Sequence, residues 1–479
     1  MASSQLERLA TACIFPGFDG VEASEWISRE CAAGLGGVVL FSRNLVDPDQ
    51  TRALCAELRR DNAGLLIGLD EEGGDVTRLE LASGSSYPGP HALGAVDDVE
   101  LTAQVARAIG GDLAAVGVDL ELAPVADVNT DPRNPVIGIR SFGDDAARVA
   151  RHVAAFTRGV QAAGVAACAK HFPGHGETHV DSHLGLPVVD VDLETLRERE
   201  LEPFRAAIEA GVRAVMTAHI VVPALDAEPA TCSPRHLTEL LRGELGFRGV
   251  AMTDALEMGA IADGIGMGEG AVRALGAGAD ALCLGAEIAA SHVEGVRGAI
   301  VAAVESGRLA LDRLEEAAGR IAELQAWTSP VAGEVDRGIG LAAARRAVRT
   351  EGLVALARAP FVVELVPEPG IAAGPAGHRF GEALAARDPR TRSVCVTAPS
   401  PAAELLAHAG EHQLVIVVRD PARHPWVASL AGELLAGSPD AIVVDVGLPT
   451  GWTAGRAAGV ITTHGGGRAS YEAAAEVLR

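Results

Sequence analysis

The chain has 479 residues, 48% of them hydrophobic, and its 64 acidic residues exceed its 40 basic residues, which gives a formal net charge of −24. Its length exceeds the roughly 250 to 300 residues at which a single hydrophobic core stops growing, so two domains are expected. The negative charge argues against a nucleic-acid partner, because counterion release from phosphates requires a basic surface.

The N-terminal residues MASSQLERLATACIFPGF lack the basic start and the long apolar stretch of an export signal. No run approaches the roughly 18 apolar residues that a membrane-spanning helix needs. The seven cysteines are scattered and form no CxxC pair, which is typical of thiols in a reducing compartment. We therefore expect a cytoplasmic protein with no membrane partner.

Short apolar runs alternate with Ala-, Leu-, Arg- and Glu-rich helical patterns, which predicts βα units around a parallel sheet. Eight such runs precede residue 290, at 12–15, 37–41, 65–69, 119–123, 167–171, 214–218, 250–254 and 281–284. Eight strands are the number that closes a (β/α)8 TIM barrel.

A helical pattern at 309–325 leads into WTSPVAGEVDRG, whose Pro and Gly residues indicate a linker. The alternation then resumes on a smaller scale, with apolar runs at 361–366, 394–397, 414–418, 441–446 and 459–462. We predict an α/β protein with a TIM-barrel domain at 1–328, a linker at 329–340 and a smaller open α/β sandwich domain at 341–479.

Polar clusters follow five of the predicted barrel strands. They are LDEEGGDVTRL with Asp70 and Arg78, DVNTDPRNPVIGIRSFG with Arg140, AKHFPGHGETHVDSHLGLP with Lys170, MTAHIVVPALD with His219 and MTDALEMGA with Asp254. Barrel enzymes carry their chemistry on loops that leave the carboxyl ends of the strands. The five clusters therefore predict one active site at that rim.

The cluster after the fifth strand is the densest. It contains four histidines at intervals of four residues, His171, His175, His179 and His183. This spacing would place them on one helix face and mimic a metal site, but the Pro and Gly residues of KHFPGHG interrupt a helix. We predict a loop with no metal, on which Asp181 and His183 meet in a tight turn. A carboxylate bonded to one imidazole nitrogen makes the other a proton carrier near neutral pH; the alternative is a purely structural hydrogen bond.

Two single residues also indicate function. Lys170 is the only lysine in the chain, which indicates a site that needs a compact ammonium group; chance survival of one lysine is the alternative. Asp254 ends an apolar run, where a carboxylate costs free energy unless it is paired or used. Asp254 fits a helix N-cap equally well.

Together, KHFPGHGETHVDSH, DEEGGDVTR, VIGIRSFG, MTAHIVVPALD and MTDALEMGA resemble glycoside hydrolase family 3, in its NagZ-type β-N-acetylglucosaminidase branch, from about residue 8 to 325. The resemblance implies that Asp254 is the nucleophile, His183 the general acid/base and Asp181 its partner. It also implies the residues that hold the sugar, namely Asp70, Arg78, Arg140, Lys170 and His171, and we add His219 as a further substrate-binding candidate.

The expected function is a retaining, exo-acting β-N-acetylglucosaminidase that uses a covalent glycosyl-enzyme and no cofactor. It would release terminal β-linked N-acetylglucosamine in cell-wall recycling or chitooligosaccharide turnover. Aromatic residues make up only 3% of the chain, which argues against a long stacked cleft for polymeric chitin and favours a small soluble glycoside. Asp75, Ile139 and Glu177 depart from the family pattern beside the sugar-binding residues, so the leaving group stays open.

Several alternatives remain. Retaining glycosidases usually use two carboxylates. A neutral histidine in place of the second one repels an incoming anion less, so inorganic phosphate could serve as acceptor in a β-N-acetylglucosaminide phosphorylase. The histidine cluster also fits a metal-dependent barrel hydrolase, although no HxH pair follows the first strand. A β-glucosidase-like member and an inactive sugar-binding protein are further possibilities. The turn TTHGGGR at 462–468 fits either an anion cradle at a helix N-terminus or a tight connection. The oligomeric state and the role of the C-terminal domain are open.

Overall fold

The computed structural model describes residues 3–178, 185–331, 333, 335–368, 377–449, 452, 455 and 457–478. The chain forms two compact units. The first contains Met1–Glu71, Thr102–Ile137 and Asp144–Val335, and the second contains Glu72–Leu101, Gly138–Gly143 and Asp336–Arg479. Two segments from within the predicted barrel domain therefore pack with the C-terminal residues. The domain boundaries at 328 and 341 stay a prediction.

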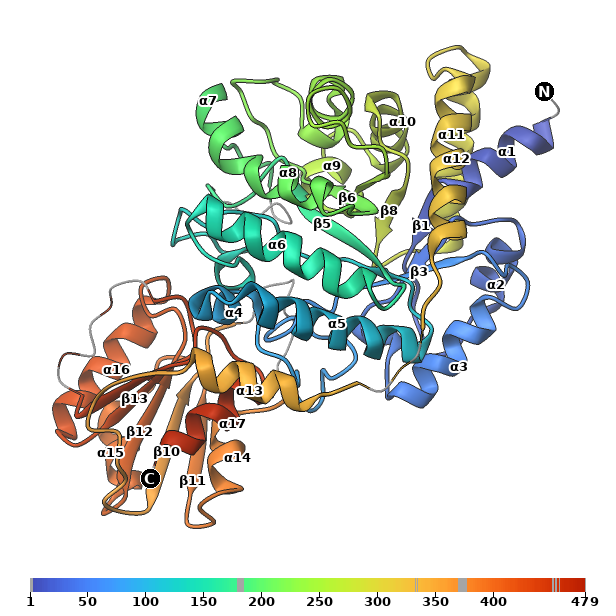
Figure 1. The fold of residues 1–479 in the computed structure, drawn as a ribbon. Helices are drawn as coiled ribbons and strands as arrows, with labels where there is room; N and C mark the ends of the chain where they lie inside the picture. The colour runs from blue at the N-terminus through green and yellow to red at the C-terminus, as the bar shows by residue number, and fades with distance from the viewer. Residues whose placement is uncertain are drawn as a thin grey trace. The chain divides into compact units, whose positions relative to one another are not determined.

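In the first unit eight strands follow the predicted runs closely (Figure 1). They are β1 Ile14–Pro16, β2 Gly37–Val39, β3 Leu66–Leu69, β4 Leu120–Glu121, β5 Ala166–Phe172, β6 Ala214–Thr217, β7 Val250–Thr253 and β8 Leu282–Gly285. Strands β2 to β7 form one parallel sheet in chain order, and β1 pairs in parallel with β8. A bridge between Met252 and Ala281 joins β7 to the residues before β8.

The strands are buried along their whole length, as expected for a parallel sheet that is covered on both faces. Glycine is needed where β2 comes close to β1. A side chain at Gly36 would collide with the carbonyl oxygen of Ala12, and one at Gly37 with the ring of Phe15. The two glycines therefore allow β2 to lie close to β1.

The helices of the first unit alternate with its strands. They are α1 Ser3–Ala12, α2 Glu25–Ala32, α3 Pro48–Leu58, α5 Val99–Val116, α6 Ala146–Gln161, α7 Leu193–Thr195, α8 Glu202–Glu209, α9 Gly259–Ala262, α10 Met267–Ala277, α11 Ala290–Glu305 and α12 Leu311–Trp327, with α5 starting in the second unit. Three begin at N-cap aspartates: Asp47 accepts a hydrogen bond from the Gln50 N–H at 2.8 Å, Asp145 from the Arg148 N–H at 2.7 Å and Asp192 from the Thr195 N–H at 2.7 Å.

The second unit contains a six-stranded mixed sheet in the order β11-β10-β12-β13-β14-β9. Its strands are β9 Arg349–Gly352, β10 Pro360–Leu365, β11 Arg392–Val396, β12 Gln413–Val418, β13 Ile442–Asp445 and β14 Gly459–Thr462. Its helices are α4 Pro90–Val96, α13 Gly338–Ala347, α14 Phe380–Ala385, α15 Ala402–Ala409, α16 Pro425–Gly437 and α17 Arg468–Val477.

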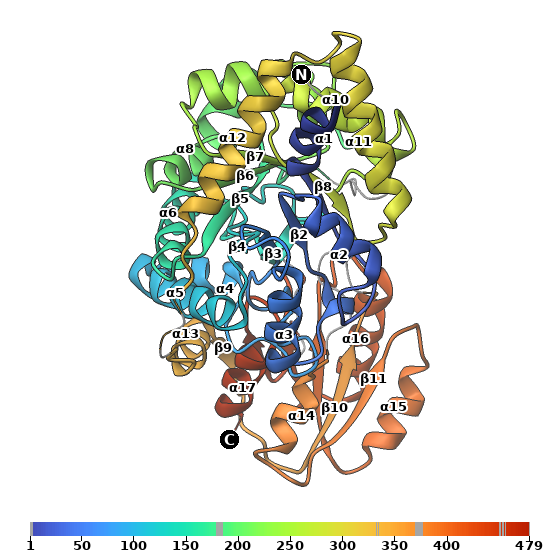
Figure 2. The same cartoon turned by 90° about the vertical axis from the view of Figure 1, so that its right-hand side faces the viewer.

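Alternate residues of this sheet face two hydrophobic cores. Val363 and Ile416 pack with α15 and α16, whereas Val362 and Val415 pack with α14 and α17 on the other face (Figure 2). This is the predicted open α/β sandwich. Only β9 was not predicted, because its sequence RTEG is polar and all four residues are exposed, so it has no apolar pattern.

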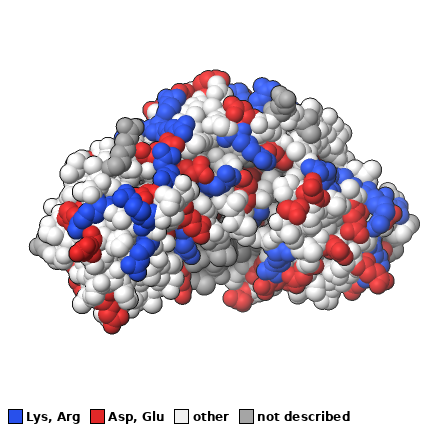
Figure 3. Space-filling view, turned by 90° about the horizontal axis from the view of Figure 1, so that it is seen from below, with Lys and Arg blue, Asp and Glu red and all other residues white. Residues whose placement is uncertain are grey.

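Acidic and basic side chains are interspersed on the face of the molecule drawn in Figure 3. Neither sign forms a continuous patch among the described residues that are visible there. Within the described chain, no helix combines the length and the hydropathy that a membrane span requires. The cytoplasmic location and the lack of a nucleic-acid partner stay predictions.

Candidate active site

Several ionisable residues of the first unit lie at the carboxyl ends of neighbouring barrel strands. Asp70 follows β3, Asp127 lies beyond β4, Lys170 and His171 are near the end of β5, His219 follows β6 and Asp254 follows β7. Because parallel strands end at one rim, these side chains are collected on the same side of the barrel, where barrel enzymes carry their active sites.

Lys170 forms an ion pair with Asp70, with 2.7 Å between Nζ and Oδ1. The side chain of Lys170 is 3% exposed and that of Asp70 is 16% exposed, so the ammonium group is almost fully withdrawn from water. A buried charge of this kind requires an oppositely charged partner. The single lysine of the chain is thus held by a carboxylate at the strand ends.

A second carboxyl group, Glu121, is fully buried at the end of β4 and accepts a hydrogen bond from the Glu71 N–H at 2.9 Å. Burial raises the pKa of Glu121 well above its ordinary value, and the nearby Asp70 and Glu71 raise it further. The carboxyl group of Glu121 thus supports the backbone beside Asp70, and its burial favours the protonated form.

His171 is held by the buried carboxylate of Asp127. The distance from His171 Nδ1 to Asp127 Oδ2 is 2.7 Å, and Asp127 Oδ1 accepts the backbone N–H groups of His171 and His175 at 3.2 and 2.7 Å. Burial acts to raise the pKa of Asp127, but the two histidines hold it below its ordinary value. Burial lowers the pKa of His175 to about 4, so that its ring is neutral. Asp127 thus fixes both the imidazole and the turn that follows it.

The pairing of β5 with β6 shifts register between Ala169 and Phe172, where two residues of β5 stand against a single residue of β6. Such a bulge changes the direction in which side chains leave a strand. It allows the consecutive residues Lys170 and His171 both to reach carboxylates at the barrel rim, Asp70 and Asp127.

The turn after His171 also packs on a buried acid. A side chain at Gly174, where φ is +129°, would lie against the carboxyl group of Glu200. Burial raises the pKa of Glu200 to about 7, although Arg199 lowers it through a 2.7 Å ion pair. Arg199 also pairs with Glu177 at 3.2 Å, so the turn is bonded to the helical residues 196–200.

Asp254 is partly exposed at the end of β7. Its Oδ1 accepts the N–H of Ala255 at 2.8 Å, and its own N–H donates to the Thr217 carbonyl at 3.2 Å. The next helix, α9, begins at Gly259 with Met258 at its N-cap. The alternative interpretation of Asp254 as a helix N-cap is therefore wrong.

Two buried thiols, Cys168 and Cys283, are affected by both Asp70 and Asp254. Burial raises the pKa of both Cys168 and Cys283, and the carboxylates of Asp70 and Asp254 each raise it further. Both carboxylates thus act on the same two thiols. Asp70 and Asp254 also follow strands of one parallel sheet, so they lie at the same rim of the barrel.

His219 is fully buried and both of its ring nitrogens contact the protein. Nδ1 lies 2.8 Å from the Thr231 hydroxyl, and Nε2 lies 3.0 Å from the Ala255 carbonyl oxygen, to which it donates. These contacts favour a role in fixing the backbone next to Asp254. Its predicted contact with substrate stays a prediction.

The two predicted sugar-binding arginines belong to the second unit. Arg140 pairs with Glu72 through two hydrogen bonds, from Nε at 2.9 Å and from Nη2 at 2.7 Å. Arg78 and Arg140 are each 8% exposed. A planar guanidinium held by a carboxylate in this way has a fixed orientation.

The predicted proton carrier, Asp181 with His183, lies outside the described residues. Among the residues that are described, no three His, Cys, Asp or Glu side chains gather as metal ligands would. Asp127 and Glu121 were not predicted as site residues from the sequence. Asp127 had one signal, its position at the start of the polar cluster DVNTDP, whereas Glu121 had none within its apolar strand.

A model of the glycosyl hydrolase family 3 N-terminal domain matches residues 19–324, which is more than half of the chain. The beta-hexosaminidase A of Pseudoalteromonas piscicida is 37% identical over 331 residues, 64% of this chain and 55% of that protein. The beta-hexosaminidase of Pseudomonas aeruginosa PAO1 is 41% identical over 228 residues, 47% of this chain and 67% of that protein. The chain thus spans about half the length of the first of these relatives.

A solved structure resembles nearly the whole chain. It is a glycoside hydrolase family 3 beta-N-acetylglucosaminidase from Paenibacillus sp. strain FPU-7, with a TM-score of 0.90 and 35% identity, and the match covers 99% of this chain and 96% of that one. This likeness confirms the predicted fold class, a parallel barrel followed by an open α/β domain.

Proposed function

Because the chain belongs to glycoside hydrolase family 3, as its motifs predicted, we propose that it is a retaining, exo-acting β-N-acetylglucosaminidase. It releases terminal β-linked N-acetylglucosamine from small soluble glycosides. The observation that carries the proposal is that Asp254 and the Asp70–Lys170 ion pair lie at the carboxyl ends of strands of one parallel sheet, in a chain similar to hexosaminidases over most of its length.

The proposed reaction has two steps. The Asp254 carboxylate attacks the anomeric carbon while His183, paired with Asp181, protonates the departing glycosidic oxygen. A covalent glycosyl-enzyme forms through an oxocarbenium-like transition state. Water that has given its proton to His183 then releases the sugar, and two inversions at one carbon retain its configuration.

The remaining residues would position one sugar ring. Lys170, Asp70 and His171 offer charged donors and acceptors to hydroxyl groups, and Arg78 and Arg140 offer planar donors to hydroxyl and acetamido oxygens. The contacts that hold Lys170 and His171 in place reduce the entropy lost on binding, since these side chains are oriented before the sugar arrives. A low content of aromatic residues supports a short substrate.

The nucleophile can be identified by trapping the covalent intermediate. Incubation with a slowly hydrolysed 2-fluoro glycoside or N-acetylglucosaminide, followed by peptide mass mapping, should place one sugar on Asp254. Asp254→Asn should lower kcat at least about a thousandfold, because no other step replaces a missing nucleophile. Asp263→Asn, which changes an exposed carboxylate shortly after Asp254 in the chain, is the matched control and should keep full activity. A label on another residue, or an active Asp254→Asn variant, would contradict the assignment.

Chromogenic substrates test the sugar. The β-N-acetylglucosaminide should be cleaved much faster than the β-glucoside, which lacks the acetamido group. The same assay with inorganic phosphate tests the acceptor: free N-acetylglucosamine as the only product identifies a hydrolase, whereas faster turnover with formation of the sugar 1-phosphate identifies a phosphorylase.

A further inference from the structure

The segment that follows β3 makes a tight turn within the second unit. The N–H of Gly73 donates to the Val76 carbonyl at 3.1 Å, and the N–H of Val76 donates back to the Gly73 carbonyl at 3.3 Å. Gly73 and Gly74 have φ values of +87° and +62°, which residues with a Cβ seldom adopt. The N–H of Gly74 also donates to the Tyr87 carbonyl at 2.8 Å. These bonds fix the position of Asp75 at the tip of the turn.

The Asp75 carboxylate is held at the carboxyl end of the second sheet. Its Oδ1 lies 2.5 Å from Arg419 Nη2, and its Oδ2 accepts the N–H of Gly466 at 2.9 Å. Arg419 directly follows β12, and Gly466 lies in the turn between β14 and α17. The side chains of Asp75 and Arg419 are 11% and 24% exposed. The turn TTHGGGR, for which the sequence left an anion cradle or a tight connection open, thus binds the carboxylate of Asp75 through the Gly466 N–H.

This edge of an open α/β sheet is where such folds usually bind their ligands. Here a turn of the same chain occupies it. The adjoining residues strengthen the attachment: Arg468 Nη2 pairs with Glu80 at 2.7 Å, Arg468 Nε donates to the Gly84 carbonyl at 3.2 Å, and the Ala469 N–H donates to the Ser85 carbonyl at 3.1 Å. The Ser85 carbonyl thus accepts one of the first N–H groups of α17, which have no partner within the helix.

The attached turn is contiguous with the two arginines that are predicted to bind sugar. Glu72, the residue before the turn, holds the Arg140 guanidinium through two hydrogen bonds, at 2.7 and 2.9 Å. Arg78 follows the turn by two residues. A displacement of Asp75 would therefore shift Glu72, and with it Arg140, as well as Arg78.

We propose that Asp75 and Arg419 are positioning residues, whose ion pair at the end of the second sheet holds the 72–78 segment so that Arg78 and Arg140 are aligned for the sugar. This inference rests on the proposed function and gives the C-terminal residues a part in substrate binding. Neither Asp75 nor Arg419 needs to contact the substrate. Their effect is transmitted through the Gly73–Val76 turn and Glu72.

Steady-state kinetics on a chromogenic β-N-acetylglucosaminide test the proposal. Asp75→Asn and Arg419→Gln should each raise KM about tenfold with a smaller change in kcat, because the misplaced arginines contribute to binding before and during the reaction alike. The double variant should show no larger increase than either single variant, since the two residues act through one contact. Additive effects of the two substitutions, or an unchanged KM, would overturn the proposal.

Val362→Ala is the matched control for stability. Val362 is fully buried in the second sheet, so its truncation leaves a cavity and destabilises this unit without touching the turn. Its KM should match the wild-type value. An equal rise in KM would mean that general loosening of the second sheet, rather than the Asp75–Arg419 contact, controls binding.

Amide hydrogen exchange tests the proposal by a second measurement, which does not depend on catalytic activity. Peptides covering residues 72–80 should exchange faster in Asp75→Asn and Arg419→Gln than in the wild-type protein, and at an unchanged rate in Val362→Ala. Unchanged exchange in all three variants would overturn the proposal by itself. A wild-type protein that cleaves no N-acetylglucosaminide would contradict the proposed function instead, and hydrogen exchange would still decide whether the ion pair holds the segment.

Discussion

The Asp127 carboxylate contacts both the His171 ring and the backbone of the following turn. One of its oxygens sets the orientation of the His171 ring, and the other binds two backbone N–H groups of the turn that follows. An acceptor at Oδ2 places the proton of His171 on Nδ1 and leaves Nε2 to interact with substrate. The carboxylate thus determines both the path of the loop and the tautomer of a predicted sugar-binding histidine.

Asp127→Asn should lower kcat/KM roughly ten- to hundredfold, because a hydrogen bond to a charged group contributes about 1.5 to 3 kcal/mol and the amide nitrogen cannot accept the His171 proton. Asp192→Asn is the control. Asp192 caps α7 by accepting the Thr195 N–H at 2.7 Å, a bond that asparagine also makes. The Asp192→Asn variant should therefore keep full activity. Full activity of Asp127→Asn would contradict the assigned role.

The same residue makes stability depend on pH in a defined direction. The folded-state pKa of Asp127 lies below its ordinary value of 3.8, so the unfolded state binds its proton first as the pH falls. Its stabilising effect is complete above about pH 4 and is lost as the pH falls through the lowered folded-state pKa. Unfolding measured in denaturant at several pH values should therefore show a shallower loss of stability below pH 4 in Asp127→Asn.

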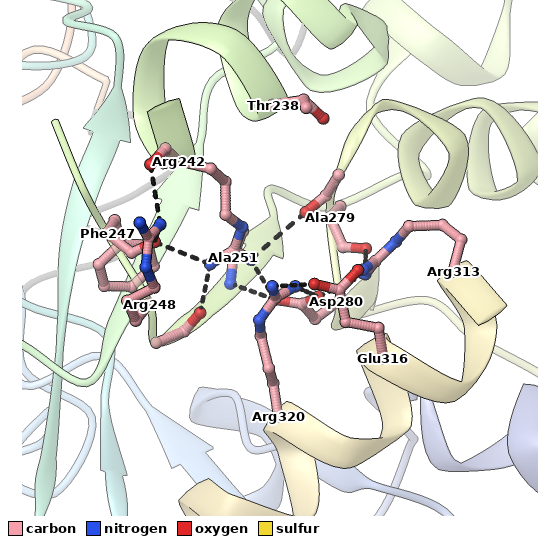
Figure 4. Close-up of polar contacts among 12 residues, drawn as sticks. Thr238, Arg242, Phe247, Arg248, Ala251, Ala279, Asp280, Arg313, Glu316 and Arg320 are labelled. Carbon is pink, nitrogen blue, oxygen red and sulfur yellow. Dashed lines mark hydrogen bonds and ion pairs between the residues drawn. The ribbon is translucent and has the colours of Figure 1, made fainter. Parts of the chain in front are cut away.

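At the scale of elements, a buried ionic cluster joins helices and strands at the amino ends of the barrel strands (Figure 4). Asp280, which precedes β8 and is fully buried, pairs with Arg242 and Arg313 at 2.5 Å each and with Arg320 at 3.0 Å. It also accepts the N–H of Ala251 on β7 at 2.9 Å. One carboxylate thus links the helical residues 235–244, α12 and β7.

Asp280→Asn should lower the free energy of unfolding by about 3 to 5 kcal/mol, because it leaves three buried or partly buried arginines without their shared counter-charge. Urea denaturation measures this as a lower midpoint. The proposed active site lies at the opposite rim of the barrel, so the KM of Asp280→Asn should hardly differ from the wild-type value. Asp388→Asn, which removes a solvent-screened surface pair with Arg390, should leave the urea midpoint nearly unchanged. Equal midpoints for the two variants would show that the cluster does not stabilise the barrel.

At the scale of the whole molecule, the metal-dependent alternative makes a different prediction from the proposed carboxylate and imidazole chemistry. The alternative needs His171 and His175 on one helix face, but β5 runs to Phe172 and no helix covers residues 173–178. The His171 ring is instead bonded to Asp127. Dialysis against a chelator should leave the rate of N-acetylglucosaminide cleavage unchanged, with metal content measured on the same sample. Loss of activity that zinc restores would favour the metal-dependent hydrolase.

Much of the fold could be predicted because it is encoded locally. A strand buried on both faces must be apolar along its length, and the eight barrel strands agree with the predicted runs to within a few residues. The exposed strand Arg349–Gly352 could not be found this way, since an antiparallel edge strand needs no apolar residues. The position of Asp254 after β7 and of Lys170 in β5 followed from the same strand pattern, which placed both at the carboxyl rim.

The two α/β folds, the family and the residue types at the barrel rim could be predicted from the sequence, because apolar periodicity and short motifs are properties of neighbouring residues. Which charges meet depends on the folded chain. Asp70 and Lys170 are 100 residues apart, and Asp75 and Gly466 are 391 residues apart. Such pairs form because the chain brings distant strand ends together, and a buried charge must then be satisfied by whatever group lies beside it.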